Sequence, residues 1–438
     1  MVRRLVVEKA YTRIIPTQRS NVRTRTKLTI LVGALALVAA ACSSAGADDD
    51  TGDAATETTA TPASPDTSLA SSTSSSQDVE ATGLPAGASA LDDRFNDAFP
   101  DPLIDVGAIL SGGPPPDGIP PIDNPQFVSV TEADEWINDP EPVLLVDVDG
   151  DVRAYPIQIM MWHEIVNDTV GDLPLAVTYC PLCNSAVSFV REVRGVETTF
   201  GTSGSLFNAN LIMYDRATES LWNQLDGRAV VGVLTGDVLE QYPSSTVSWA
   251  DLKATKPDAK VLDRNRTGAS RNYGTNPYTG LDDPNGQPFL FSGDVDVRAK
   301  AMQNIVAMET ATDAVAWSLD ILSDDSGSSA TAGEFDGEPI VIFWKSGEAS
   351  ALDTSDISNG KDVGTVGVFS SVADGQELTF TSEDGSYIDD QTSSTWNIFG
   401  EAVDGPLEGT TLDPITFVRT FWFSWAAFRP DTDLVDAS

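Results

Sequence analysis

The sequence of 438 residues is poor in histidine, cysteine and basic residues. A single His excludes a zinc site with two or more His ligands, and three Cys are too few for a zinc ribbon. Lys and Arg number 26 against 66 Asp and Glu, so the formal net charge is −40. Phosphate backbones repel a chain of this charge, and nucleic-acid binding is therefore excluded.

A long hydrophobic run is also missing near the N-terminus. Residues 28–40 form an apolar stretch of 13 residues, whereas a membrane-spanning helix needs about 20. This stretch follows a basic cluster at 23–27 and precedes Ala41-Cys42, which is the order of a secretory signal peptide. Residues 38–42, Val-Ala-Ala-Ala-Cys, resemble a bacterial lipobox, whose Cys carries lipid after cleavage.

We therefore expect residues 1–42 to be a lipoprotein signal peptide and Cys42 to be lipidated. The protein would then lie outside the cytoplasm, anchored to the cell membrane by its lipid. An ordinary signal peptide or an uncleaved anchor is the alternative.

The next segment lacks the residues that build a core. From Ser43 to Asp93 there is no Lys, no Arg and no aromatic residue. Such a segment cannot bury enough apolar surface to offset chain entropy, so residues 43–93 are predicted to be a disordered tether. Phe95 and a Pro-rich stretch over 100–125 mark the start of the ordered part.

The ordered part contains an internal repeat. Residues 222–241 and 396–414 align with one deletion and share eight identities, beginning with Trp-Asn in both segments. Short β-branched and aromatic runs dominate both halves, and Asp149-Gly150 is typical of a hairpin turn. Each half also has one helix candidate, at 157–170 and at 314–322.

These patterns predict an α+β protein, mostly antiparallel β, with two related domains from an internal duplication. The first domain, 94–260, contains the two remaining cysteines, and the second, 261–438, has no thiol. Two unrelated β-rich segments with similar turns are the alternative. The turn matched to the cysteines in the second copy, near 344–347, is expected to have no polar cluster around it.

Chemistry is most readily assigned to Cys180 and Cys183, a CxxC pair in which Pro181 restrains the turn. One thiol can attack a substrate while the other resolves the product. A structural disulfide is the alternative, although so short a loop removes little entropy from the unfolded chain. Asn184 stands where a haem-attachment motif has His, and strand-like runs on both sides are unlike the thioredoxin arrangement.

Three further positions are candidates for supporting roles. His163 lies on the predicted helix before the Cys-bearing strand, so it could move protons for a thiolate or serve as a third metal ligand. A purely structural His is the alternative. Glu164 could orient His163 or face water. Arg216 is present only in the first copy, where it could supply positive charge to a thiolate.

Four long segments together resemble a known prokaryotic family. They are residues 149–183, 202–227, 271–280 and 421–434. The family is the domain of unknown function three-one-seven-nine, whose members are labelled "domain-containing (seleno)protein". The resemblance implies that selenocysteine can replace the residue at Cys180 or Cys183 in some members, which favours redox catalysis. It implies no substrate, because the family's activity is unassigned.

The sequence departs from the family pattern at two places. Arg429 stands where the resemblance leads us to expect His, and Asn184-Ser185 replace an expected Gly-Thr. If the missing His were essential, the activity of this chain would be altered.

The sequence therefore predicts an exported lipoprotein with a thiol-redox site of unknown substrate, which would engage a redox partner protein. Two alternatives remain. One is a copper-type metal-binding lipoprotein that uses Cys180, Cys183 and His163. The other is a non-catalytic binding or scaffold protein with a structural disulfide. No cofactor follows from the sequence.

Overall fold

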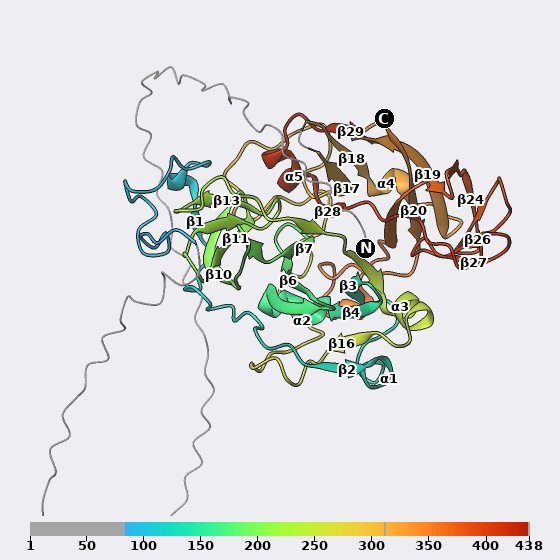
Figure 1. The fold of residues 1–438 in the computed structure, drawn as a ribbon, viewed down its shortest axis with the longest axis horizontal. Coiled ribbons are helices and arrows are strands. Elements are labelled where there is room, and N and C mark those ends of the chain that lie inside the picture. The colour runs from blue at the N-terminus through green and yellow to red at the C-terminus, as the bar shows by residue number, and fades with distance from the viewer. Residues whose placement is uncertain (1–83, 311, 437–438) are drawn as a thin grey trace, which may run out of the picture. The chain divides into compact units, whose positions relative to one another are not determined.

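The computed structural model describes residues 84–310 and 312–436 (Figure 1). The predicted signal peptide, Cys42 and the tether up to residue 83 lie outside the described residues. The last part of the predicted tether, 84–93, lies within them, and Leu84 and Ala90 are buried there. No helix in the described part of the chain has the length and apolar character needed to cross a membrane.

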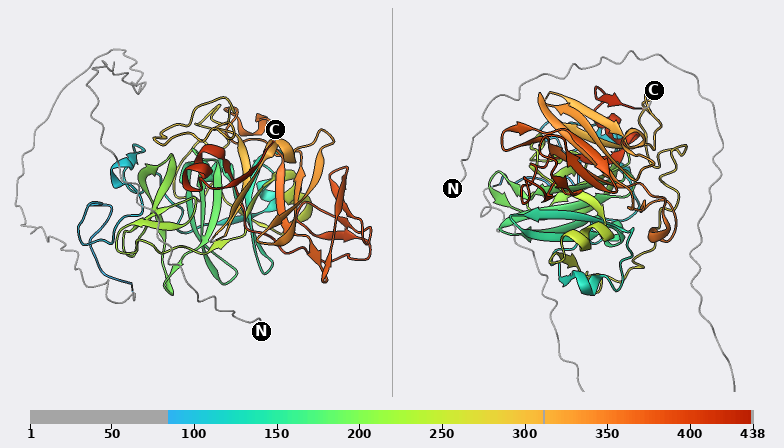
Figure 2. Two further views of the ribbon diagram at one scale, coloured as in Figure 1. Left: turned by 90° about the horizontal axis from the view of Figure 1, so that it is seen from above. Right: turned by 90° about the vertical axis from the view of Figure 1, so that its right-hand side faces the viewer.

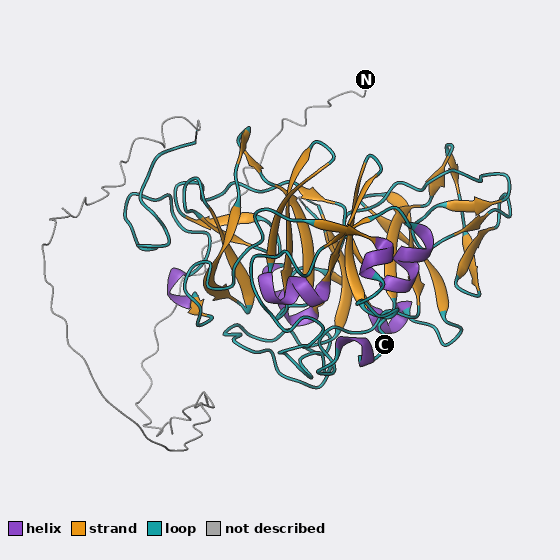
Figure 3. Cartoon of the chain, turned by 90° about the horizontal axis from the view of Figure 1, so that it is seen from below, coloured by secondary structure: helices purple, strands orange, loops and turns teal. Residues whose placement is uncertain are grey.

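The fold is α+β and mostly antiparallel, as the sequence predicts (Figure 3). Helices are short: the longest α-helices among the described residues have seven residues. The core therefore depends on sheets, whose strands present alternate side chains to each face.

The first half builds three larger sheets, with strand orders β15-β3-β4-β16-β2, β14-β7-β6-β5 and β1-β10-β11-β12-β13, and the two-stranded sheet β8-β9. The bounds are η2 (Val106–Ala108), β1 (Leu110–Ser111), β2 (Phe127–Ser129), α1 (Val130–Ala133), β3 (Pro142–Val148), β4 (Asp151–Pro156), α2 (Ile157–His163), β5 (Ile165–Val170), β6 (Leu173–Cys180), β7 (Ser185–Val190), β8 (Glu192–Val193), β9 (Val196–Glu197), β10 (Phe200–Phe207), β11 (Asn210–Asp215), β12 (Leu221–Asn223), β13 (Arg228–Val231), β14 (Gln241–Tyr242), β15 (Ser245–Ser248), α3 (Trp249–Thr255) and β16 (Lys260–Leu262).

The second half has the sheets β28-β17-β18-β29, β19-β20-β21 and β24-β25-β26-β27. Its bounds are β17 (Asn304–Glu309), β18 (Ala314–Ser318), α4 (Leu319–Leu322), β19 (Ser328–Phe335), β20 (Glu338–Lys345), η3 (Ile357–Asn359), β21 (Thr365–Ser370), β22 (Val372–Ala373), β23 (Gln376–Glu377), β24 (Phe380–Glu383), β25 (Ser386–Asp389), β26 (Thr395–Trp396), β27 (Ala402–Asp404), β28 (Val418–Phe421), α5 (Trp422–Phe428) and β29 (Asp433–Val435). From β3 to β13 and from β17 to β27, the order of strands and α-helix is the same, and the second range has the additional 3-10 helix η3 between β20 and β21.

Local sequence explains the hairpin and the helix that precede the cysteines. Asp149 and Gly150 both have positive φ, 50° and 88°, and close the two-residue turn between β3 and β4. Helix α2 is buried on most sides, in keeping with its apolar residues. It ends at Glu164, whose φ of 60° turns the chain into β5.

The two halves share one hydrophobic core. The largest buried cluster includes Phe189 and Trp222 from the first half together with Ile305 and Trp422 from the second. Strand β28 lies against β7, and the green and orange strands are neighbours in both views of Figure 2. Strand β16, which spans the predicted boundary at 260/261, pairs with β4 and β2 of the first half.

Candidate functional site

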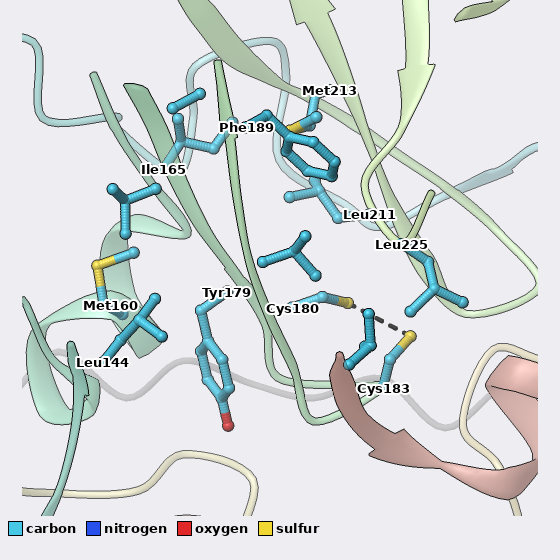
Figure 4. Close-up of a cluster of buried hydrophobic side chains, with 14 of the residues drawn as sticks. Leu144, Met160, Ile165, Tyr179, Cys180, Cys183, Phe189, Leu211, Met213 and Leu225 are labelled. Carbon is cyan, nitrogen blue, oxygen red and sulfur yellow. Dashed lines mark hydrogen bonds between the residues drawn. The ribbon is translucent and has the colours of Figure 1, made fainter. Parts of the chain in front are cut away.

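The thiol pair lies at the end of a central strand, as the sequence predicts. Cys180 is the last residue of β6, and a tight turn leads to Cys183 and then to β7. Both thiols are free and buried, and their Sγ atoms face each other at 3.5 Å (Figure 4). This separation is typical of a hydrogen bond between two thiols. The two sulfur atoms would have to move only a little closer to form an S–S bond of about 2.05 Å.

A buried hydrogen-bond network aims a donor at Cys183. The side-chain amide nitrogen of Asn210 lies 3.4 Å from the Cys183 sulfur. The amide oxygen of Asn210 accepts from the backbone N–H of Leu225 at 3.0 Å, which leaves the NH₂ group facing the sulfur. Gln224 accepts a second N–H of this amide at 3.0 Å and a hydrogen bond from Ser185 at 2.9 Å.

The opposite side of the pair is formed by a strained turn between β10 and β11. Ala209 has φ 63°, which is costly for a residue with a Cβ, and it is completely buried. Its carbonyl oxygen lies 3.3 Å from the Cys183 sulfur and 3.8 Å from the Cys180 sulfur. A thiol of the pair can therefore donate its proton to this oxygen, and the turn holds that acceptor in place.

The second half of the chain completes the surroundings of Cys183. The backbone oxygen of Cys183 accepts hydrogen bonds from the hydroxyl of Thr420 at 2.8 Å and from the N–H of Phe421 at 3.0 Å. Ser424, on α5, is buried and its hydroxyl has no oxygen or nitrogen partner in the described residues. This hydroxyl is available to donate to the Cys183 sulfur.

The two thiols differ in acidity. Burial raises the pKa of Cys180 well above its ordinary value, and its hydrogen bond to Cys183 raises it further. Burial also raises the pKa of Cys183, but hydrogen bonds from Cys180, Ser424 and Asn210 outweigh it, so that this pKa is lowered overall. The pair therefore favours a thiolate on Cys183 and a proton on Cys180.

Cys180 also faces a small pocket with a volume of about 100 Å³. Most of its wall is apolar, formed by Ile119, Leu182, Leu206, Leu211, Phe289 and Leu290. Glu164 is its one carboxyl group, and Tyr278 contributes a phenol. The pocket is thus an apolar space in which a thiol and a carboxyl group meet.

Glu164 is held at this pocket by its backbone. Its N–H donates to Met160 at 2.7 Å, and its carbonyl oxygen accepts from the N–H of Tyr179, next to Cys180, at 2.8 Å. Its side chain has no hydrogen-bond or ion-pair partner among the described residues, although only 7% of the residue is exposed. Burial, and then the neighbouring Cys180, raise the pKa of Glu164 well above its ordinary value, so this site favours the protonated form of the carboxyl group.

His163 is placed differently from the expectation of a proton shuttle. Its ring is buried, with Nδ1 2.7 Å from the carbonyl oxygen of Pro120 and Nε2 2.7 Å from the hydroxyl of Tyr273. Pro120 can only accept, so Nδ1 carries the proton and Nε2 accepts from Tyr273. Burial lowers the pKa of His163, which keeps the ring neutral. Both ring nitrogens are occupied, and neither is hydrogen-bonded to a sulfur.

Arg216 also has other partners than the thiols. Its guanidinium contacts Asp123 at 2.7 Å and Asp117 at 3.1 Å, which ties the segment before β2 to the end of β11. Its backbone N–H donates to Thr199 at 2.9 Å, and the N–H of Asp390 makes the matching bond in the second half. The side chain of Arg216 therefore serves as a clamp between two segments of the first half.

The predicted metal set is not brought together. Within residues 84–310 and 312–436, no three His, Cys, Asp or Glu side chains are close enough to hold a metal ion. Sequence reasoning named Glu164 only as a partner of His163 and did not single out Asn210, Ser424 or Tyr278. A usable signal existed for all three, because Asn210, Tyr278 and Ser424 lie in segments that carry the family resemblance, 202–227, 271–280 and 421–434.

The matched turn of the second copy differs from the expectation. Strand β20 ends at Lys345, and residues 346–364 replace the short turn that holds the cysteines. Glu348 follows this strand and is buried against Arg419 at 2.8 Å, with Thr365 as a further partner. The expected absence of a polar cluster is therefore wrong, because the longer loop returns a buried carboxylate to an arginine of β28.

Comparison with known proteins gives one match. A family model with the description "Protein of unknown function (DUF3179)" matches residues 116–432, which include both cysteines, Glu164 and Tyr278. Neither the curated proteins nor the solved structures contain a significant match.

Proposed function

Because the chain belongs to the DUF3179 family, whose description assigns no activity, we propose a function from the chemistry of the site itself. The protein is a thiol-redox protein in which Cys180 and Cys183 interconvert between a dithiol and a disulfide. The observation that carries this proposal is the sulfur pair at 3.5 Å, with one thiol more acidic and the other less acidic than usual.

The burial of the pair divides the work between the two sulfurs. Cys180 faces the pocket and is the sulfur that an oxidised substrate meets. Cys183 is enclosed by protein, and its thiolate can take the proton of Cys180 through their hydrogen bond as Cys180 attacks. Cys183 then attacks the oxidised Cys180, which closes the disulfide and releases the product.

A redox titration of the full chain tests this function. We expect Cys180 and Cys183 to form one intramolecular disulfide, with a reduction potential above about −300 mV. Mass spectrometry after alkylation, across a series of dithiothreitol buffers, measures the oxidised fraction. A potential well below that value would indicate an inert structural disulfide and support the scaffold alternative instead. Elemental analysis of the same sample separates both from the metal-binding alternative.

We also propose that the chain is an exported lipoprotein, supported by the basic cluster, the apolar stretch and the lipobox-like residues 38–42. The mature protein is expected to begin with a lipidated Cys42. Intact-mass and N-terminal peptide analysis of protein from a membrane fraction measure this. Detection of residues 38–41 in the mature chain would contradict the cleavage.

We further infer that the two halves arose by duplication of one domain. The shared order of elements supports this inference, and so does a turn built around a buried Asp in each half. Asp215 accepts from Thr218, Ser220 and the Trp222 indole, the last at 3.0 Å. Asp389 accepts in the same way from Thr392, Ser394 and the Trp396 indole, again at 3.0 Å.

A further inference from the structure

We propose that the site reduces small apolar hydroperoxides, with Cys180 attacking the peroxide from the pocket and Glu164 protonating the departing alcohol. This inference rests on the proposed thiol-redox function and names the substrate class of the same site. Three observations carry it: the size of the pocket, the apolar character of its wall, and the unpartnered carboxyl group beside the thiol.

The pocket restricts what can reach Cys180. Only 2% of Cys180 is exposed, so the disulfide of a folded protein has no access to its sulfur in this structure. An apolar cavity of about 150 Å³ holds benzene, so the smaller volume of about 100 Å³ limits the reactant at Cys180 to a small molecule. Charged disulfides such as oxidised glutathione are larger than this and would lose their hydration against an apolar wall.

The carboxyl group of Glu164 indicates which bond is broken. Cleavage of a disulfide releases a thiolate, which leaves readily without a proton because the thiol is a moderate acid. Cleavage of an O–O bond releases an alkoxide, a much stronger base, and therefore benefits from a proton donor in the transition state. A buried, protonated carboxyl group next to the attacking sulfur meets that need, and no hydrogen bond within the described residues gives this side chain another role.

Tyr278 also lines the pocket at Cys180. It lies there together with Glu164, and burial, followed by Glu164 and Cys180, raises the pKa of its phenol. Its hydroxyl has no hydrogen-bond partner within the described residues and can donate to the peroxide. The pocket thus offers the Cys180 sulfur, the Glu164 acid and the Tyr278 hydroxyl, and the rest of its wall is largely apolar, with Thr202 and Ser205 as further hydroxyl-bearing residues.

The reaction balances in two steps. In the first step, the hydroperoxide transfers its terminal OH group to the sulfur of Cys180, which becomes a sulfenic acid. The proton of the Cys180 thiol passes to the Cys183 thiolate, which becomes a thiol. Glu164 gives its proton to the departing alkoxide, which leaves an alcohol and the Glu164 carboxylate. The S–O bond forms as the O–O bond breaks, and the sulfur of Cys180 is oxidised by two electrons. In the second, the Cys183 thiol attacks the sulfenic acid, forming the disulfide and releasing water. An external dithiol then restores the reduced pair.

The test compares the reduced full chain with Glu164→Gln, using tert-butyl hydroperoxide as the probe. Gln has the shape of Glu, but its amide cannot transfer a proton as a carboxylic acid can, and we expect thiol oxidation to slow by about 100-fold. Oxidation by dimethyl disulfide, a small apolar molecule that releases a thiolate and not an alkoxide, should be unchanged in the same variant. Glu338→Gln, an exposed position on β20, is the matched control and should behave as the unmodified chain with both oxidants.

The pH profile adds a readout that a merely structural role would not move. The rate of the unmodified chain with tert-butyl hydroperoxide should fall at high pH as Glu164 loses its proton, because its pKa is raised. Glu164→Gln should lack this fall. In a Cys183→Ser chain, the sulfenic acid on Cys180 has no resolving thiol and should be trapped by dimedone, a measurement that does not depend on any change at Glu164.

Three results would decide against the proposal. Equal rates for the unmodified chain and Glu164→Gln with tert-butyl hydroperoxide would remove Glu164 as the acid. Oxidation by oxidised glutathione but not by the hydroperoxide, with no dimedone adduct on Cys180, would overturn the substrate class and leave the thiol-redox function standing. Failure of every oxidant to form the Cys180–Cys183 disulfide would overturn both.

Discussion

Serine at position 180 is expected to abolish substrate reduction, lowering the rate by at least about 10³-fold, the scale seen when a nucleophile is removed. A hydroxyl is far less acidic than a thiol, so no nucleophile would face the pocket. The exchange of sulfur for oxygen is small, and the fold should persist. Peroxide or disulfide consumption in the presence of excess dithiothreitol, with circular dichroism as the check on folding, measures this effect.

Cys183→Ser is the matched variant, and its behaviour should differ in kind. This chain keeps the sulfur that faces the pocket but loses the resolving sulfur and the thiolate that takes the proton of Cys180. We expect a single slow turnover that stops with Cys180 oxidised or bound to the substrate. If Cys183→Ser turned over normally while forming no adduct, or if only Cys183 became modified, the order of attack proposed for the two sulfurs would be wrong.

The position of the thiol pair follows from local sequence. A CxxC between two strand-like runs has to occupy a strand end and the next turn, and β6 and β7 place it there. Trp222, the first residue of the aligned segment 222–241, is completely buried in the core. In both cases, neighbours within a few residues determine the outcome.

The role of the residues around the pair does not follow from local sequence. His163 finds its partners 43 and 110 residues away, at Pro120 and Tyr273. The next residue, Glu164, turns to the pocket because the helix ends there with a positive φ, which a count of helical periodicity does not register. The pocket wall comes from segments near 112–119 and 278–290, so its existence depends on long-range packing.

Whether the two halves are separate domains also depends on long-range packing. The sequence repeat suggests two separable domains, but β28 and α5 of the second half cover Cys183. The thiol-free second half therefore contributes directly to the site, through Thr420 and Ser424. The alignment of the two repeat segments gives no indication of this contact.

Asp215→Asn and Asp389→Asn are expected to destabilise the chain by similar amounts, about 3 kcal/mol each. Each Asp is completely buried and accepts from two backbone N–H groups, a threonine hydroxyl and an indole. The carboxylate has two accepting oxygens, whereas the amide of Asn has one oxygen and one NH₂ group. That NH₂ group would face N–H and O–H donors and leave buried groups without a hydrogen-bond partner. Denaturant unfolding followed by tryptophan fluorescence measures both changes.

The comparison between the two variants tests the inferred duplication, because turns that descend from one ancestor and keep the same hydrogen bonds should lose the same free energy. Asp384→Asn is the control: this residue is exposed in the turn between β24 and β25, and its φ of 50° suits Asn well. It should change stability by less than about 0.5 kcal/mol. A large loss at Asp215 beside a negligible loss at Asp389 would mean that the two turns share geometry without sharing their role, and the similarity would then reflect common turn chemistry in two independent β-rich segments.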